Sequence, residues 1–460
     1  MKTKAVPSGW LERDGRRLDC GPYMSGALEA KVLLDRLKVR KDALQAVTSN
    51  GIAGIFNGPR FARSYVDDRA LGVPFLGSTD ILDADLTSLP LLSRKQVAAN
   101  PRLVVHADWT LITCSGTIGR TAYARSDMEG MAGSQHFMRV VPDPEKISPG
   151  YLYAYLSSKF GVPLVVGGTY GAIIQHIEPE HIANLPVPRV GKLIETEVHE
   201  LISEAAKLRD EAATSKQKAL ARVHELLMWR TAPATNITQA AASALQRRLD
   251  AFHHTPRVVE ARESLARLGA ERLRNKVDSV FEPNRGPRLK VEDRAFGVPF
   301  LSSSEVFRLD PVGEYSISTR RTPHLDRLLV SERDLLLPRS GQLGGIIGRA
   351  VLPLPTYYGH AASEHLVRVR CTSKEDAFFL WSVFASEPGY LATIGTAFGS
   401  SIPSLDCELL ADLQVPWFDD EERSQLSELV GSAVHANTRA IHAERNAVRI
   451  VEYAIENEAS

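Results

Sequence analysis

Two short turns carry residue types that suit contacts to a phosphate group or to the edge of a DNA base. Each combines a hydroxyl group and a glycine with a basic or amide side chain: Ser115, Gly116 and Arg120 in the first turn, and Arg339, Ser340, Gly341 and Gln342 in the second. Hydroxyl groups, arginines and exposed backbone N–H groups donate hydrogen bonds to phosphate oxygens and base edges. The alternative is a strand-to-strand turn that needs glycine only for its backbone angles, and for either turn alone it is the simpler interpretation.

A second set of basic residues precedes each turn: Arg60, Arg63, Arg285, Arg288 and Lys290. These residues suit a DNA backbone, although a solvated loop face has the same composition. Arg320 and Arg321 have no counterpart in the first half of the chain. Such a difference fits a specificity region and fits an ordinary surface loop equally well. Because acidic residues nearly balance the basic ones around both turns, any DNA affinity must come from their arrangement in space.

The motifs of common enzymes are missing from the sequence. We find no phosphate-binding G-x-x-x-x-G-K-[ST], no H-E-x-x-H and no G-x-S-x-G. The acidic string from Asp143 to Lys146 is a solvated turn, because adjacent residues beside prolines cannot converge on one metal ion. His136 and His365 occupy equivalent positions, but a histidine on an apolar strand is more often a structural residue. We therefore expect a chain without catalytic activity and without a bound metal or cofactor.

These candidate residues belong to an internal repeat. The segment DDRALGVPFLGST at residues 67–79 recurs as EDRAFGVPFLSSS at residues 292–304, 225 positions later. The same offset relates Ser115 to Ser340, and a slightly larger one relates SQHFMRV at residues 134–140 to SEHLVRV at residues 363–369. A self-similarity of this length decides the architecture. The chain is a tandem duplication, and two copies of one fold usually pack with approximate two-fold symmetry.

Each copy is predicted to hold a mixed α+β body followed by a long helix. The body contains buried strands at residues 109–114 and 334–337, strands expected to be half-buried at 136–141 and 365–370, and helices at 149–158 and 374–385. Apolar residues then recur every three or four positions, which is typical of a coiled-coil seam. In the second copy Asn437 and Glu444 interrupt this seam. A helix of about 36 residues spans roughly 54 Å, or about one and a half turns of B-DNA.

The predicted domains follow from the repeat. We expect an N-terminal segment and helix (1–50), a first body (51–189) and a first helical spacer (190–228). A linker with helices (229–275), a second body (276–417) and a second helical spacer (418–460) follow. The fold class is α+β, with two tandem-repeated domains, each followed by a long helical spacer, in a pseudo-two-fold arrangement.

Composition excludes several classes of protein. The chain has 460 residues, 44% of them apolar, and 55 basic residues balance 55 acidic ones. It is therefore globular and does not bind polyanions through bulk charge. The four cysteines are scattered, which favours neither a disulfide framework nor a zinc site. The longest apolar stretch is short and interrupted by proline and glycine, so we expect a cytoplasmic protein without a membrane segment.

This organisation resembles the specificity (S) subunits of type I restriction-modification enzymes. The matching pieces are the V-P-F-L-x-S-[ST] strand, the S-G-x-[IL]-G turn, the G-x-x-x-G turns at 167–171 and 395–399, the short runs that end at Pro188 and Pro416, and the heptad tails. The resemblance covers nearly the whole chain and rests on order and spacing. The second copy departs from it where SIPSLDCELL replaces IIQHIEPEHI.

The resemblance implies a non-catalytic reader of double-stranded DNA in a phage-defence system. Two target-recognition domains would each read one half of a bipartite site, and the helices would set the gap and dock two methyltransferase (modification) subunits. Restriction subunits that translocate DNA can join that core. S-adenosylmethionine, ATP and Mg would belong to these partners and not to this chain.

Three alternatives stay open. The chain could be a scaffold that holds protein subunits without touching bases, although the polar stretch at 315–342 does not favour this. It could be a nuclease with an unrecognised metal site, against which the lack of convergent carboxylates argues. It could also serve another methyltransferase-based defence system.

Overall fold

The computed structural model describes residues 3–13, 21–167, 176–230, 239, 248–399 and 401–459. The chain forms two compact units: unit 1 comprises Met1–Asp210 with Arg439–Ser460, and unit 2 comprises Glu211–Thr438. Three features discussed above lie outside the described residues: most of the first G-x-x-x-G turn, most of the alanine-rich linker before Leu249, and Cys20.

Unit 1 contains three small sheets. The first is an antiparallel pair of β1 (Lys41–Ala43) and β10 (Pro186–Pro188). The second contains, in spatial order, β2 (Ile55–Asn57), β9 (Phe137–Val140), β6 (Thr110–Thr113) and β7 (Thr121–Tyr123). The third has the order β3-β5-β4-β8, with bounds Tyr65–Val66, Leu91–Ser93, Gly72–Leu76 and Ala132–Gly133.

Unit 2 repeats these sheets, with three strands in place of four in the second one. The pair is β11 (Ala270–Arg272) with β21 (Gln414–Pro416). The second sheet is β12-β18-β16, with bounds Val277–Phe281, Leu366–Cys371 and Asp334–Pro338. The third is β13-β15-β14-β17, with bounds Lys290–Val291, Tyr315–Ser318, Gly297–Leu301 and Ala361–Ala362. An extra hairpin joins β19 (Ala397–Phe398) to β20 (Ser404–Leu405).

The register of the strands also repeats. Phe75 of β4 lies opposite Ala132 in a parallel pairing, and Phe300 of β14 lies opposite Ala361 in the same way. Mixed sheets that combine antiparallel hairpins with one parallel strand are typical of α+β folds. The structure thereby confirms the α+β class and the duplication of the bodies.

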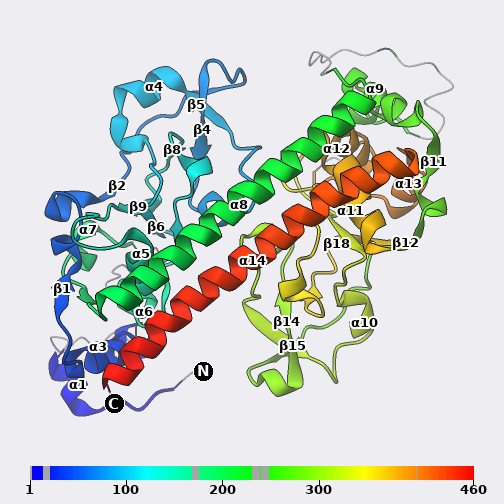
Figure 1. The fold of residues 1–460 in the computed structure, drawn as a ribbon. Helices are drawn as coiled ribbons and strands as arrows, with labels where there is room; N and C mark the ends of the chain where they lie inside the picture. Colours follow the sequence, from blue (N-terminus) through cyan, green and yellow to red (C-terminus); the bar gives the residue numbers. More distant parts are fainter. Residues whose placement is uncertain are drawn as a thin grey trace. The chain divides into compact units, whose positions relative to one another are not determined.

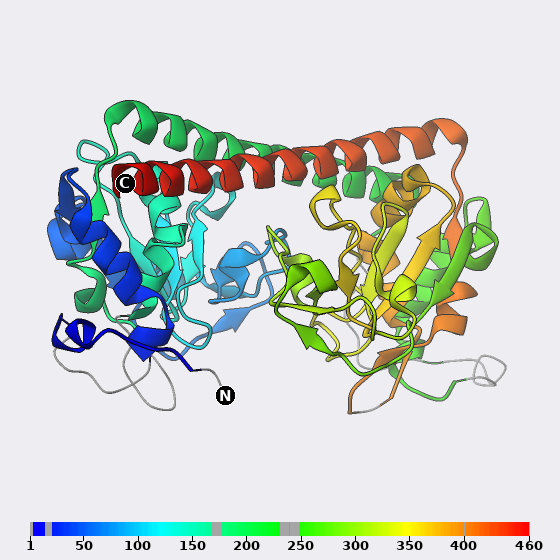
Figure 2. The ribbon, with the colours of Figure 1, turned by 90° about the horizontal axis from the view of Figure 1, so that it is seen from below.

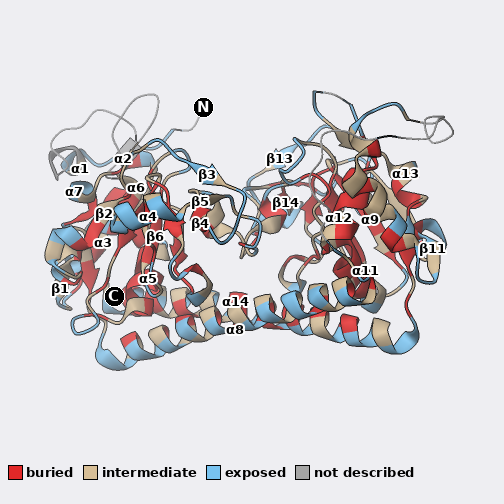
Figure 3. Ribbon diagram, turned by 90° about the horizontal axis from the view of Figure 1, so that it is seen from above, coloured by how far each residue is buried: buried red, intermediate tan, exposed pale blue. Residues whose placement is uncertain are grey.

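The shorter helices pack around these sheets. In unit 1 they are α1 (Ser8–Arg13), α2 (Gly21–Met24), α3 (Ala27–Arg36), α4 (Arg94–Ala99), α5 (Pro149–Ser157), α6 (Gly161–Gly167) and α7 (Pro179–Ile182). In unit 2 they are α9 (Pro256–Ala266), α10 (Leu325–Leu328), α11 (Lys374–Ala385), α12 (Glu387–Ile394) and α13 (Cys407–Ala411). Helices α5, α11 and α12 are buried along most of their length and form the centre of each core (Figure 3).

Two long helices complete both cores. Helix α8 (Lys192–Leu226) begins in unit 1 and ends in unit 2, whereas α14 (Asp420–Ala459) begins in unit 2 and ends in unit 1. In unit 1, Val198 of α8 and Val451 of α14 belong to one apolar cluster, and in unit 2 Val223 and Leu426 do. The helices lie side by side within each unit (Figures 1 and 2). The heptad seam read from the sequence is thus the buried face of both helices.

The structure explains why Glu444 interrupts the seam. Its carboxylate accepts hydrogen bonds from Arg209 of α8 and from the hydroxyl of Tyr153 of α5. Burial acts to raise the pKa of Glu444, but Arg209 and Tyr153 outweigh it and hold that pKa below its usual value. At the equivalent place in unit 2, Lys216 lies 5.3 Å from the ring centre of Trp381. Each unit therefore has its own polar contact between a long helix and the body.

The prediction of half-buried strands at 136–141 and 365–370 is wrong. Every residue of β9 is buried, and so is every residue of β18 except Arg370. Both strands are central in their sheets, so neighbours cover their edges while helices and loops cover their faces. The arginines of these strands, Arg139 and Arg368, are completely buried. Their side chains bind backbone carbonyl groups, which replaces the hydration that an arginine normally requires.

Candidate nucleic-acid interface

In unit 1 the basic loop and the serine-glycine turn meet at one place. Arg63 Nη2 donates a hydrogen bond of 2.8 Å to Gln135 Oε1, and Ser115 Oγ lies 2.6 Å from His136 Nδ1. Ser115 also forms a β-bridge with His176. Because Gln135 and His136 are adjacent, they join the two features that the sequence presented separately. We call this set the unit-1 cluster, and its members are Arg60, Arg63, Ser115, Gln135, His136 and His176.

The positive charge of the unit-1 cluster comes from its arginines. Burial lowers the pKa of His136, and the nearby Arg63, Arg60 and His176 lower it further, so His136 is neutral near pH 7. The amide nitrogen of Gln135, Nε2, lies 2.9 Å from His136 Nε2 and can only donate a hydrogen bond to it. The ring proton of His136 is thereby assigned to Nδ1, where it reaches Ser115. Arg60 and Arg63 are both exposed at the surface.

Unit 2 builds the same arrangement with different partners. Arg339 Nε lies 2.9 Å from Glu282 Oε2, and Arg285 Nε lies 3.8 Å from the other oxygen of that carboxylate. Arg288 Nη2 donates to Glu364 Oε1 over 2.5 Å. Ser340 forms a β-bridge with Ser404, and the hydroxyl groups of these two serines lie 2.7 Å apart. This bridge is equivalent to the one between Ser115 and His176. The unit-2 cluster consists of Glu282, Arg285, Arg288, Arg339, Ser340, Glu364 and Ser404.

One arginine in each cluster lies over an aromatic ring of the neighbouring sheet. The guanidinium carbon of Arg63 is 4.9 Å from the ring centre of Phe75, and that of Arg288 is 4.5 Å from the ring centre of Phe300. These phenylalanines are equivalent residues of β4 and β14. A cation over an aromatic face is attracted by the ring and held in a defined orientation. Both clusters therefore present an arginine whose position is fixed by the fold.

The clusters differ in charge at two equivalent positions. Unit 1 has Asn57 where unit 2 has Glu282, and Gln135 where unit 2 has Glu364. Asn57 donates a hydrogen bond of 3.0 Å to Glu178, and Gln135 accepts one from Arg63, so Arg63 has a neutral partner. The unit-2 arginines instead face two carboxylates. The duplicated scaffold is thus common to both units, while the charges of the side chains that face its arginines have diverged.

Buried arginines support both clusters from below. Arg139 donates to the backbone carbonyls of Gly133, Ser134 and Phe137, which belong to the loop that carries Gln135 and His136. The same contacts run from Arg368 to the backbone carbonyls of Ala362, Ser363 and Leu366, around Glu364 and His365. Burial lowers the pKa of Arg139 to about 9 and that of Arg368 to about 10, so both stay charged at neutral pH. The conserved spacing of the arginine in HFMRV and HLVRV was the signal in the sequence.

The remaining predicted residues lie outside these contacts. Arg120 is half-buried, and its backbone pairs with Thr113 across the turn. Lys290 Nζ lies 4.0 Å from the ring centre of Tyr315, and Arg320 lies 5.9 Å from that of Phe296. Arg321 and Gln342 are exposed. Among the described residues, no hydrogen bond or ion pair brings Arg320 or Arg321 into the unit-2 cluster.

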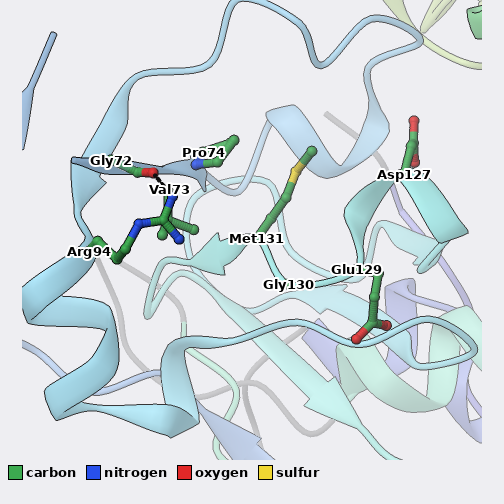
Figure 4. Close-up of a pocket in the computed structure, with 8 residues that line it drawn as sticks. All are labelled: Gly72, Val73, Pro74, Arg94, Asp127, Glu129, Gly130 and Met131. Carbon is green, nitrogen blue, oxygen red and sulfur yellow. Dashed lines mark hydrogen bonds between the residues drawn. The ribbon is translucent and has the colours of Figure 1, made fainter. Parts of the chain in front are cut away.

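A surface pocket in unit 1 is a poor candidate for a separate site (Figure 4). Its charged residues already have partners within the chain. Arg94 donates to the carbonyl of Gly72, Asp127 pairs with Arg125, and Glu129 accepts from the backbone of Ala107 and contacts His106. A ligand would have to break these contacts to bind there.

In the described part of the chain, no group of three or more histidine, cysteine, aspartate or glutamate side chains could hold a metal ion. Within the same residues, no helix is long and apolar enough to cross a membrane.

No protein-family model matches the chain, and no curated protein matches its sequence. Three solved structures are similar to it. One is the S subunit of a type I restriction-modification system from M. genitalium, with 11% sequence identity, a TM-score of 0.36, and an alignment that covers 92% of this chain and 96% of that one. Another is the HsdS subunit from Thermoanaerobacter tengcongensis, with 13% identity, a TM-score of 0.28, and coverage of 91% of this chain and 97% of that one. The third describes complex assembly and conformational transition of the type I R-M system, with 13% identity, a TM-score of 0.29, and coverage of 90% of this chain and 97% of that one. TM-scores below 0.5 do not establish a common fold, so the repeated topology of the two units remains the stronger observation.

Proposed function

We propose that this chain is the DNA-reading specificity subunit of a type I restriction-modification complex. The observation that carries this proposal is the duplicated cluster. Two bodies with the same topology each present arginine, serine and amide or carboxylate side chains from equivalent loops. Two similar readers with different exposed side chains are what a bipartite, asymmetric DNA site requires. Each unit would read one half of that site.

The composition of the clusters suits contacts to DNA. Arginine recognises guanine through two hydrogen bonds, glutamine recognises adenine, and a carboxylate accepts from the amino group of cytosine. Serine and backbone N–H groups bind phosphate oxygens and fix the register of the protein on the duplex. The centre of a protein–protein interface is depleted in charged residues, whereas both clusters contain two or more arginines.

The long helices suit a spacer and a docking site for partner subunits. Helices α8 and α14 have 35 and 40 residues, which corresponds to about 52 and 60 Å. Two methyltransferase subunits would bind the helical regions and supply S-adenosylmethionine chemistry, and restriction subunits would supply ATP- and Mg-dependent translocation and cleavage. An exposed tyrosine, Tyr453, and the exposed Leu193 lie on the outer faces of these helices. A chain with balanced charge is compatible with this role, because partner subunits can enclose the duplex.

The proposal is tested by mapping DNA methylation in the host. The chain is purified with the methyltransferase encoded beside it, and methylated positions are mapped with and without this chain. We expect a split motif with a fixed gap that disappears when the chain is deleted. Unchanged methylation despite a stable complex would favour the scaffold, and cleavage or modification of DNA by the chain alone would favour an enzyme.

A further inference from the structure

The two clusters hold their equivalent arginines in different electrostatic states. In unit 2 the side chain of Glu364 is only 10% exposed and lies beneath Arg288, whose side chain is 33% exposed. Burial acts to raise the pKa of Glu364, but the hydrogen bond from Arg288 outweighs it and lowers that pKa. Glu364 is therefore ionised at neutral pH, and it compensates the charge of the arginine above it. In unit 1 the neutral Gln135 takes this place, and no ion pair within the described residues compensates the charge of Arg63.

Compensation changes what an arginine can bind. A phosphate attracts net positive charge, so an arginine that already faces a carboxylate gains little from a phosphate contact. The directional hydrogen bonds of the guanidinium group are still available, because it has five N–H groups and Glu364 accepts from only one nitrogen. The edge of guanine presents two acceptors, O6 and N7, that match two of these donors.

The orientation of Arg288 is fixed on several sides. Glu364 Oε1 accepts a hydrogen bond of 2.5 Å from Arg288 Nη2, and the hydroxyl of Tyr315 lies 3.5 Å from Arg288 Nη1. The guanidinium carbon of Arg288 lies 4.5 Å from the ring centre of Phe300. Glu364 itself belongs to the loop whose carbonyls bind the buried Arg368. A side chain held in this way loses little conformational entropy when it binds, and it discriminates against acceptors in other positions.

We propose that Arg288 reads a guanine in the half-site of unit 2, that Glu364 is the positioning residue that directs it to a base, and that the equivalent Arg63 contacts a phosphate. This inference rests on the proposed function. It assigns different roles to two arginines that are equivalent in sequence and in fold, and it names the buried residue that separates those roles.

The experiment measures DNA binding by the complex with its methyltransferase subunits, using duplexes that carry the mapped site and its single-base variants at several KCl concentrations. We expect Glu364→Gln to steepen the slope of log K against log salt by about 0.9, because one more phosphate is neutralised. Discrimination at one G·C pair in the half-site of unit 2 should fall roughly tenfold. Arg288→Ala should remove the discrimination at the same pair.

The reciprocal change is the matched control. Gln135→Glu should make the slope shallower by about 0.9 and leave base preference in the half-site of unit 2 unchanged. If Glu364→Gln melts at the wild-type temperature but leaves both the slope and every base preference unchanged, the inference is overturned while the proposed function stands. A wild-type complex that shows no sequence preference at all overturns both.

Discussion

Arg139 Nη1 donates a hydrogen bond of 2.9 Å to the backbone carbonyl of Ser134, inside the protein and without any contact to solvent. The equivalent Arg368 donates to Ser363 over 3.0 Å. Both arginines lie directly beneath the loop that joins the basic residues of its cluster to the serine-glycine turn. The duplication has therefore kept a buried support and varied the side chains that stand above it.

Removing this support should destabilise the unit that loses it. Arg139→Met is expected to lower the free energy of unfolding by about 3 kcal/mol or more, because the mutation leaves several buried carbonyl groups without donors. Urea denaturation with fluorescence detection measures the change. Arg36→Met, at an exposed position in the same unit, is the control and should change stability by less than about 0.5 kcal/mol. Equal stability of the two variants would contradict the role of Arg139.

The buried contact between α8 and α14 should be sensitive to a single deletion. Glu444→Ala leaves Arg209 and Tyr153 without their shared acceptor, and we expect a loss of about 3 to 5 kcal/mol. Replacing Glu444 and Arg209 together with apolar residues should cost much less, since no uncompensated charge remains. Thermal unfolding of both variants separates these outcomes. A double variant as unstable as Glu444→Ala would show that the charge itself is not the cause.

Acid should weaken the same contact. The pKa of Glu444 is lower in the folded chain than its usual value, so the folded state binds fewer protons than the unfolded state does near pH 4. The stability that this residue contributes is present above the unfolded pKa and is lost as the pH falls through the folded pKa. Unfolding measured between about pH 6 and pH 3 should show a steeper loss in the wild type than in Glu444→Gln. Identical pH dependence of the two proteins would exclude this contribution.

The ion pair between Arg339 and Glu282 gives a further test at the surface. Arg339→Ala leaves Glu282 facing only the distant Arg285, which increases negative charge near the DNA. We expect DNA affinity to fall roughly tenfold with little change in melting temperature. Arg339→Ala combined with Glu282→Gln should recover part of that affinity, and binding assays on both variants measure this. A large loss of stability without a change in binding would instead identify a structural turn.

Much of the fold could be predicted from the repeat. The strands that contain Thr110 and Asp334, the helices that begin at Pro149 and Lys374, and the long helical tails are visible in the sequence because apolar periodicity and the offset agree. The burial of Arg139 and Arg368 was missed, because alternation along a single strand does not show that neighbouring strands and loops cover both its edges and its faces. Long-range hydrogen bonds, such as those from Arg139 to the loop before β9, decide that point.

The sequence predicted only part of each candidate site. The basic residues and the serine-glycine turns were identified, but not the residues that connect them, Gln135 and Glu364. Their position depends on the pairing of β6 with β9 and of β16 with β18, which brings segments separated in the chain into contact. The exchange of Asn57 for Glu282 and of Gln135 for Glu364 could have been read from the repeat once its offset was known.

The proposal that each unit reads its own half-site is tested most directly by methylation maps of hosts that carry either Arg60→Ala with Gln135→Ala, or Arg285→Ala with Arg288→Ala. We predict that the first pair relaxes or abolishes recognition in one half of a split motif, that the second pair affects only the other half, and that the gap stays constant. Equal effects of both pairs on both halves, or an unchanged motif in both hosts, would contradict the assignment of one cluster to each half-site.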